Sequence, residues 1–151
     1  MGISARRGFM LFAALSVFAY SENRFSEDIA RDFERAQALG DAGNEENAKT
    51  SWRDFIRRYP NHHLTDDAYY NLAELYQRQA RYGDAVELYK KVYTFPESQR
   101  AAEAALAIGL CLVKLNKMRE ARTQWRAVER RFPKTKAAKE ASTLLLGTKE
   151  P

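Results

Sequence analysis

The chain has 151 residues, of which 45% are hydrophobic and 30% charged, a composition ordinary for one soluble domain. Its formal net charge of +5 includes Arg6 and Arg7; without these two, 23 basic residues face 20 acidic ones, and this small excess does not indicate nucleic-acid binding. The single cysteine, Cys111, excludes an internal disulfide, and we expect it to be a buried packing residue.

The first nineteen residues, 1–19, have the layout of a secretory signal peptide. Arg6 and Arg7 precede an uncharged stretch over 8–19. As a helix this stretch is about 18 Å long, well short of a bilayer core of roughly 30 Å, so a cleaved peptide is favoured over a permanent anchor. Small residues favour cleavage at the end of that stretch or, equally, after Ser21. We predict a periplasmic or secreted protein; the alternative is anchoring in the inner membrane by an uncleaved segment.

Other export signals fit this segment less well. A twin-arginine signal usually has Ser or Thr where Ala5 stands, and a mitochondrial transit peptide would carry arginines along one face. No cysteine stands directly after the apolar stretch, which excludes lipoprotein processing.

Beyond a short lead over residues 20–28, the chain is repetitive. Three aromatic–proline dipeptides recur at intervals of 36 and 37 residues, namely Tyr59-Pro60, Phe95-Pro96 and Phe132-Pro133. Each unit also has a small, an apolar, an alanine, an aromatic and a second apolar residue at matching offsets. These five columns are Ala36, Ala73 and Gly109; Leu39, Tyr76 and Leu112; Ala48, Ala85 and Ala121; Trp52, Tyr89 and Trp125; Phe55, Val92 and Val128. Self-similarity at this period is typical of stacked repeat architectures.

The spacing within each unit predicts two helices separated by a tight turn. Residues three and four apart share one helix face, and Gly83-Asp84 and Asn116-Lys117 are helix-stop signals. The predicted repeats span about 29–65, 66–101 and 102–136, followed by a capping helix over 136–146 that Gly147 ends. The predicted helices begin near Ser26, Thr50, Thr65, Gly83, Ser98, Arg119 and Lys136.

This pattern resembles the tetratricopeptide repeat, a helix-turn-helix unit of about 34 residues with alanine, aromatic and proline at these offsets. The resemblance covers residues 29 to about 133. It implies an all-α fold, a right-handed superhelix of three repeats plus the capping helix, in one domain over 29–147. It also implies a scaffold that binds protein or peptide.

The order of a signal peptide and three such repeats also resembles two envelope families. The units that carry this resemblance run from Gly43 to Pro60, from Tyr82 to Pro96 and from Met118 to Pro133. The families are the C-terminal repeat domain of the Tol-Pal-associated cell division coordinator and the barrel-assembly outer-membrane lipoprotein. The resemblance implies a periplasmic scaffold for envelope or cell division proteins. The chain departs from the coordinator in having no coiled-coil segment before its repeats, and from the lipoprotein in having no lipid-bearing cysteine.

The resemblance also implies where a partner binds, because the first helices of such units line a concave surface. We expect a groove that is polar in the first two units and apolar in the third, suited to an extended or helical peptide. The expected groove residues are Phe33, Gln37, Tyr70, Glu74, Gln77, Leu106, Leu110 and Val113. Alternatively, the final helix covers part of this groove, or its apolar strip joins copies of the chain into a homo-oligomer. Only Asn71 matches the lysine and asparagine set of co-chaperone repeats, so we do not expect binding of a chaperone tail.

The sequence shows no signal for catalysis, cofactor or metal binding. A metal site needs three or four converging ligands, whereas His62 and His63 are adjacent in a predicted loop and point apart. Thr65, which follows them, is expected to cap the next helix. We therefore do not expect an enzyme.

Overall fold

A computed structural model describes residues 24–95 and 97–148. The predicted signal peptide, 1–19, lies outside the described residues. The part of the chain so described contains helices and no strand, which confirms the all-α prediction. An N-terminal helix covers 24–41, and the others are α2 (Glu45–Arg58), α3 (Thr65–Arg78), α4 (Tyr82–Val92), α5 (Ala101–Lys114), α6 (Met118–Arg131) and α7 (Lys136–Gly147).

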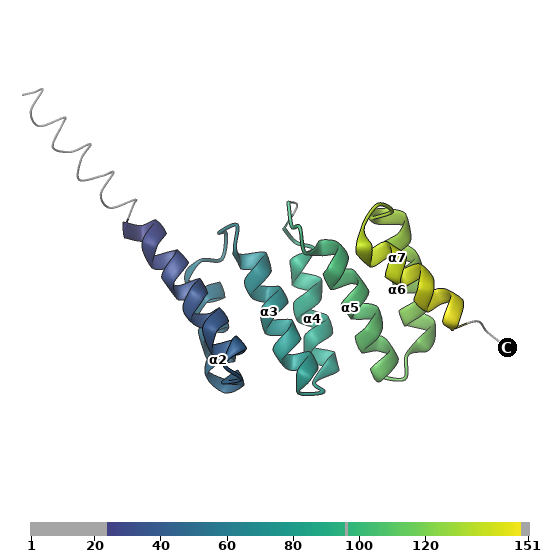
Figure 1. Cartoon of the computed structure of the whole chain (residues 1–151), viewed down its shortest axis with the longest axis horizontal. Coiled ribbons are helices and arrows are strands. Elements are labelled where there is room, and N and C mark those ends of the chain that lie inside the picture. The colour runs from purple at the N-terminus through teal and green to yellow at the C-terminus, as the bar shows by residue number, and fades with distance from the viewer. Residues whose placement is uncertain (1–23, 96, 149–151) are drawn as a thin grey trace, which may run out of the picture.

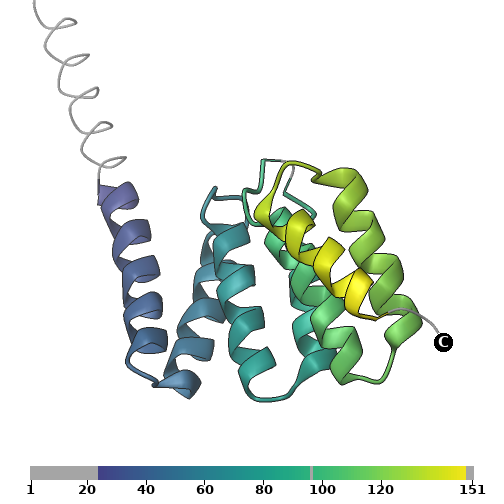
Figure 2. The same cartoon turned by 45° about the vertical axis from the view of Figure 1, so that its right-hand side comes forward.

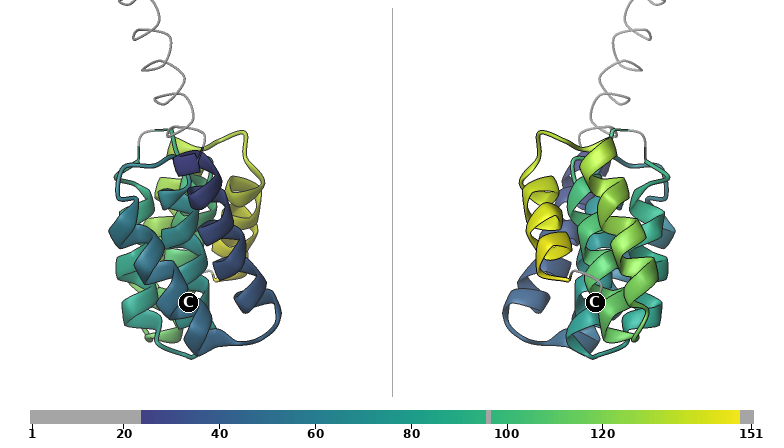
Figure 3. Two further views of the ribbon diagram at one scale, coloured as in Figure 1. Left: turned by 90° about the vertical axis from the view of Figure 1, so that its left-hand side faces the viewer. Right: turned by 90° about the vertical axis from the view of Figure 1, so that its right-hand side faces the viewer.

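The helices follow one another side by side from the N-terminal helix to α7 (Figure 1). Each packs against the next, from α2 against α3 through to α6 against α7, and α7 also contacts α5. Figure 2 shows α7 in front of the α5–α6 pair. The end-on views in Figure 3 place α7 and the N-terminal helix on the same side of the array. The last helix thus has the position that the first helix of a further unit would have.

The core follows the repeated columns. The second helices α2, α4 and α6 each bury an alanine, an aromatic and an apolar residue at spacings of four and three, as predicted. These buried residues are Ala48, Trp52 and Phe55; Ala85, Tyr89 and Val92; Ala121, Trp125 and Val128. Burial of each large apolar side chain in these columns supplies about 1.5–3 kcal/mol, so the columns contribute much of the stability of the stack.

The turns within the three units are also equivalent. Each contains one residue with positive φ, namely Gly43 (73°), Ala80 (57°) and Asn116 (61°). In each turn the next amide N–H bonds to the carbonyl five residues earlier, at Leu39, Tyr76 and Leu112 respectively. This is the Schellman arrangement that closes a helix C-terminus.

Some helix boundaries differ from the prediction. α3 and α7 begin at Thr65 and Lys136, as expected, but α2 begins at Glu45 rather than near Thr50. Gly83 lies within the first turn of α4, and the helix break precedes it at Ala80. Thr65 does not cap α3: its hydroxyl donates to the Tyr59 carbonyl.

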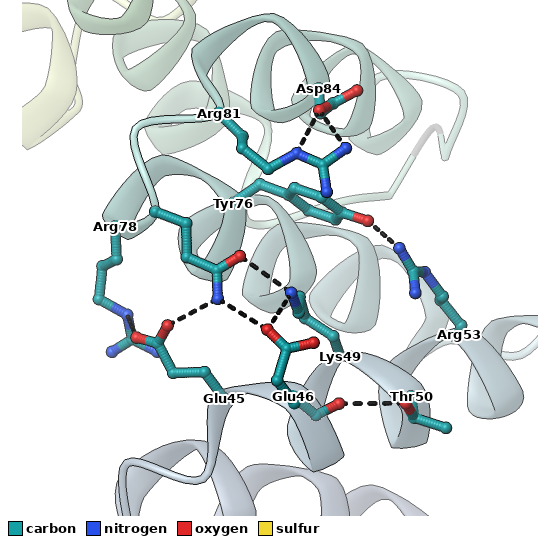
Figure 4. Close-up of polar contacts among 10 residues, drawn as sticks. Glu45, Glu46, Lys49, Thr50, Arg53, Tyr76, Arg78, Arg81 and Asp84 are labelled. Carbon is teal, nitrogen blue, oxygen red and sulfur yellow. Dashed lines mark hydrogen bonds and ion pairs between the residues drawn. The ribbon is translucent and has the colours of Figure 1, made fainter.

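A polar network joins the first two units where the start of α2 meets the end of α3 (Figure 4). Lys49 is 6% exposed, and its ammonium donates to Glu46 Oε1 at 2.6 Å and to Gln79 Oε1 at 2.9 Å. Gln79 Nε2 in turn donates to Glu45 Oε2 at 2.8 Å. Beside this network the guanidinium of Arg81 stacks over the Tyr76 ring, 4.5 Å from its centroid. The buried ammonium thus has partners in both of these units, and the network links them.

Candidate functional site

A cavity of about 540 Å³ opens where α3, α5 and the start of α6 meet the end of α7. α3 brings its last turn to this cavity, α5 its C-terminal half, and α7 its final turn. The lining residues are Glu74, Gln77, Arg78, Tyr82, Leu110, Cys111, Val113, Lys114, Met118, Trp125, Leu144 and Thr148. This volume is within the range of sites that hold a large side chain or a small ligand.

The walls are apolar and the rim is charged. Leu110 and Val113 of α5 and Leu144 of α7 are half-buried, and Met118 at the start of α6 is 40% exposed. Because a methionine is flexible and polarizable, Met118 can adapt to different side chains. On the rim, Lys114 is exposed and forms no ion pair within the described part of the chain.

Gln77 organises the floor of the cavity. Its Oε1 accepts hydrogen bonds from the Tyr89 hydroxyl at 3.0 Å and from the Cys111 thiol at 3.5 Å. Burial raises the pKa of Cys111 to about 11 and also raises the pKa of Tyr89. Both groups are therefore neutral donors at physiological pH, and the Gln77 side chain is held in one orientation.

A second, more polar cavity of about 240 Å³ adjoins the first between the N-terminal helix and α3. Phe33, Gln37 and Asn71 line it, and it shares Glu74 and Arg78 with the first cavity. Although the Glu74 side chain is exposed, neighbouring protein displaces part of its water, which raises its pKa. The two cavities thus form one path along α3, polar toward the N-terminal helix and apolar toward α7.

The structure separates the predicted groove residues into three groups. Glu74, Gln77, Leu110 and Val113 line the apolar cavity, and Phe33, Gln37 and again Glu74 line the polar one. Tyr70 and Leu106 line neither of these cavities.

Packing explains these two differences. Leu106 is only 8% exposed, and its carbonyl accepts a hydrogen bond from Trp125 Nε1 at 3.4 Å, so the prediction that it faces the groove is corrected. The Tyr70 ring packs edge-on against Tyr89 with centroids 5.4 Å apart, beneath the guanidinium of Arg100. Both residues help to hold neighbouring helices together.

Sequence reasoning missed the residues that complete the apolar cavity. Met118 follows a turn, Leu144 lies in the last helix, and Thr148 follows directly after that helix. One alternative raised by the sequence was that the final helix covers part of the groove. The structure agrees in part, because the final turn of α7 forms one wall of the apolar cavity. The column pattern carries no information about that wall, because α7 lies outside the three repeated units.

Within the described residues, no three His, Cys, Asp or Glu side chains come together in a way that could hold a metal ion. The expectation that His62 and His63 point apart was wrong: their rings stack with centroids 4.1 Å apart, and His62 Nδ1 accepts from the Leu64 amide at 3.2 Å. These contacts help to order the loop that ends the first unit. In the same described part of the chain, none of the helices combines the length and hydropathy that crossing a bilayer requires.

Two family models for the tetratricopeptide repeat match the chain, one over residues 66–98 and the other over 32–62 and 103–135. Together they cover more than half of its length. The chain belongs to the tetratricopeptide repeat family. Tetratricopeptide repeats form protein–protein interaction scaffolds and are generally non-catalytic, so this repeat protein is an interaction scaffold.

Solved structures show the same fold. The Arabidopsis OM64 TPR domain superposes with a TM-score of 0.64 at 19% identity, over 82% of this chain and 98% of that one. The N-terminal domain of stress-induced protein-1 (STI-1) from C. elegans gives a TM-score of 0.66 at 17% identity, over 78% of this chain and 94% of that one. At these identities the likeness concerns the fold alone. Comparison with curated protein sequences gave no match.

Proposed function

We propose that this tetratricopeptide repeat protein is an exported scaffold that holds a polypeptide segment along α3, with one large apolar side chain in the apolar cavity. The observation that carries the proposal is that cavity, whose walls Leu110, Val113 and Leu144 are ordered by packing before any partner arrives. A preformed pocket for one side chain reduces the entropy lost on binding and is the usual centre of a binding energy hot spot.

The rim and the adjoining polar cavity suggest how the rest of the segment lies. Glu74 and Arg78 stand where the two cavities meet, so they can bond the main chain of a ligand that passes from one to the other. Gln37 and Asn71 offer further donors and acceptors in the polar cavity. This arrangement suits an extended segment whose apolar anchor lies at one end.

The proposed location is the periplasm or the cell exterior, and the proposed setting is envelope organisation of the Tol-Pal or cell division kind. Arg6, Arg7 and the uncharged stretch over 8–19 support export, because they have the layout of a signal peptide. N-terminal sequencing of the protein recovered from its cells tests this: a mature chain should begin at Tyr20 or Glu22. A chain that retains Met1 in the cytoplasm would contradict export.

Site-specific photocrosslinking tests the binding role. A photoreactive amino acid at Met118, 40% exposed at the cavity, should crosslink a partner polypeptide in the native cells. The matched control is Leu115, which is 37% exposed but does not line the cavity. We expect a specific product at position 118, lost with Val113→Glu, and none at 115.

Three other results would contradict the proposal. Equal products at the two positions would mean unspecific contact, and no product at position 118 would mean that the cavity holds no protein ligand. A product with twice the mass of the chain would assign the cavity to self-association instead.

A further inference from the structure

Four arginines form a stripe along one side of α6, at the C-terminal end of the array. Their spacings of three, four and four residues place them one above another on the helix. Arg119, Arg126 and Arg130 are exposed, and Arg122 is partly buried and donates to the Thr148 carbonyl. This arginine stripe consists of Arg119, Arg122, Arg126 and Arg130. None of the four lines either of the cavities described above.

Three of these arginines differ from most of those in the rest of the fold. Elsewhere ion pairs are common, such as Arg58 with Asp32 and Arg100 with both Asp67 and Glu103. Within the described residues, by contrast, Arg119, Arg126 and Arg130 form no ion pair or hydrogen bond through their side chains.

The charge of the whole molecule is divided in the same way. Residues 24–113 carry 12 basic and 15 acidic side chains, whereas residues 114–148 carry ten basic and three acidic ones. The positive charge is therefore concentrated on the last two helices.

Most of the stripe works against the stability of its own helix; of the four arginines only Arg130, in the last turn, is favoured by the helix dipole. Like charges four residues apart, such as Arg122 and Arg126 or Arg126 and Arg130, destabilise a helix by about 0.2–0.5 kcal/mol per pair. Arg119 lies in the first turn of α6, where the helix dipole disfavours positive charge. A surface that served solubility alone would mix both signs. Attraction between these arginines and an anionic partner would offset these repulsions.

The neighbouring flank of α7 adds an apolar contact point. Arg122 meets the end of α7 at Thr148, and the Ser142 hydroxyl donates to Glu129 Oε1, so the two helices are antiparallel neighbours (Figure 2). Leu146 is four residues after Ser142 and therefore shares that flank, where it is 69% exposed. The side chain of Leu146 thus stands at the edge of the stripe.

We propose that the arginine stripe and Leu146 dock an acidic amphipathic helix of a partner protein. Carboxylates spaced three and four residues apart on such a helix repeat at the same interval as the guanidinium groups, and each of the three exposed guanidinium groups can form two parallel hydrogen bonds with one carboxylate. Leu146 would contact an apolar residue on the adjoining side of that helix. The docked helix would then take the place that the next helix occupies in a longer array.

The shape of the stripe favours a helix over a lipid surface or a nucleic acid. It follows one face of a single helix and is about 17 Å long, from eleven residues at 1.5 Å each. A membrane or a duplex would contact a broad basic face, whereas a line of charges matches another line of charges.

A synthetic peptide tests the proposal on the full chain. The probe is a helical peptide with glutamates at spacings of three, four and four and one leucine beside them, and its control has the same residues with the glutamates distributed around the helix. By fluorescence anisotropy in about 50 mM salt, where charges are little screened, we expect the patterned peptide to bind about tenfold more tightly than its control. Arg126→Glu with Arg130→Glu should abolish this preference.

The matched control variant is Arg35→Glu with Lys91→Glu, which reverses two exposed cations that lie away from the stripe and form no ion pair within the described residues. It should bind like the unmodified chain, and circular dichroism should show that both double variants remain helical. Equal binding of the two peptides would overturn the proposal. So would binding of phosphatidylglycerol vesicles or duplex DNA through the stripe while the patterned peptide stays unbound.

Discussion

Gly109 of α5 lies directly against the indole of Trp125 of α6, so closely that a Cβ atom at position 109 would overlap the ring. The indole N–H also donates to the Leu106 carbonyl at 3.4 Å, which fixes the ring in place. The residues equivalent to Gly109 in the other units are Ala36 and Ala73, both with no exposed surface. The small column is therefore the point of closest approach between the helices of a unit, and in the third unit only glycine fits.

We expect Gly109→Ala to lower the free energy of unfolding. Overpacking a core lowers the free energy of unfolding by roughly 1–3 kcal/mol, whereas the better helix propensity of alanine raises it by at most about 1 kcal/mol. Urea unfolding followed by circular dichroism measures the difference. Gly83→Ala is the matched control, because Gly83 also lies in a helix but a Cβ there meets nothing within 4 Å. A loss that is equal in both variants would show that the Gly109–Trp125 contact is not limiting.

Ala80→Gly should stabilise the protein. Ala80 has a φ of 57°, a left-handed conformation that costs an alanine roughly 1–2 kcal/mol. Glycine removes this strain but adds about 0.4–1 kcal/mol of unfolded-state entropy, so we expect a net gain of about 0.5–1 kcal/mol. Thermal and urea unfolding check the gain. Ala30→Gly, at an exposed position within the N-terminal helix, should instead destabilise; a loss of stability for Ala80→Gly would contradict the turn geometry.

A double-mutant cycle on Lys49 and Gln79 tests the junction of the first two units. Gln79→Ala removes one acceptor from a buried ammonium and should cost about 1–3 kcal/mol. When Lys49→Met is added, no unpaired buried charge remains, because Glu46 is exposed, so the loss in the double variant should fall short of the sum of the two single losses by at least about 0.5 kcal/mol. Gln99→Ala, at an exposed glutamine, is the control and should change little. Strict additivity would show that the two residues act independently.

The sequence predicts the stack well, since its repeated columns record which side chains are buried. Ala48, Trp52 and Phe55 share a period that only a helix face explains, and all three are buried. The turns are harder to locate, because glycine is the usual residue at positive φ. The break was therefore predicted at Gly83, three residues after its actual position. In the structure Ala80 has the positive φ, although this conformation is strained for an alanine.

The candidate site is only partly readable from sequence. Offsets along one helix identified Leu110 and Val113, which line the apolar cavity. They misplaced Leu106, which is only 8% exposed, because spacing along one helix does not give its rotation against the neighbouring helices. Leu144 closes the cavity from a helix outside the repeats, where the columns give no register.

Cys111 should react slowly with thiol reagents, and its reaction should depend steeply on pH. The residue has no exposed surface, its thiol donates to Gln77 Oε1, and burial raises its pKa to about 11. Only the thiolate reacts, and below this pKa its fraction rises about tenfold with each unit of pH. An unperturbed thiol would reach its plateau above a pKa of about 8.5, so the labelling rate of the folded protein should still be rising at pH 9 to 10, whereas the rate in urea should level off. Stopped-flow labelling with an aromatic disulfide across this pH range measures both rates. A half-maximal labelling rate near pH 8.5 in the folded protein would mean that the floor of the apolar cavity opens to water, and that the cavity is not preformed.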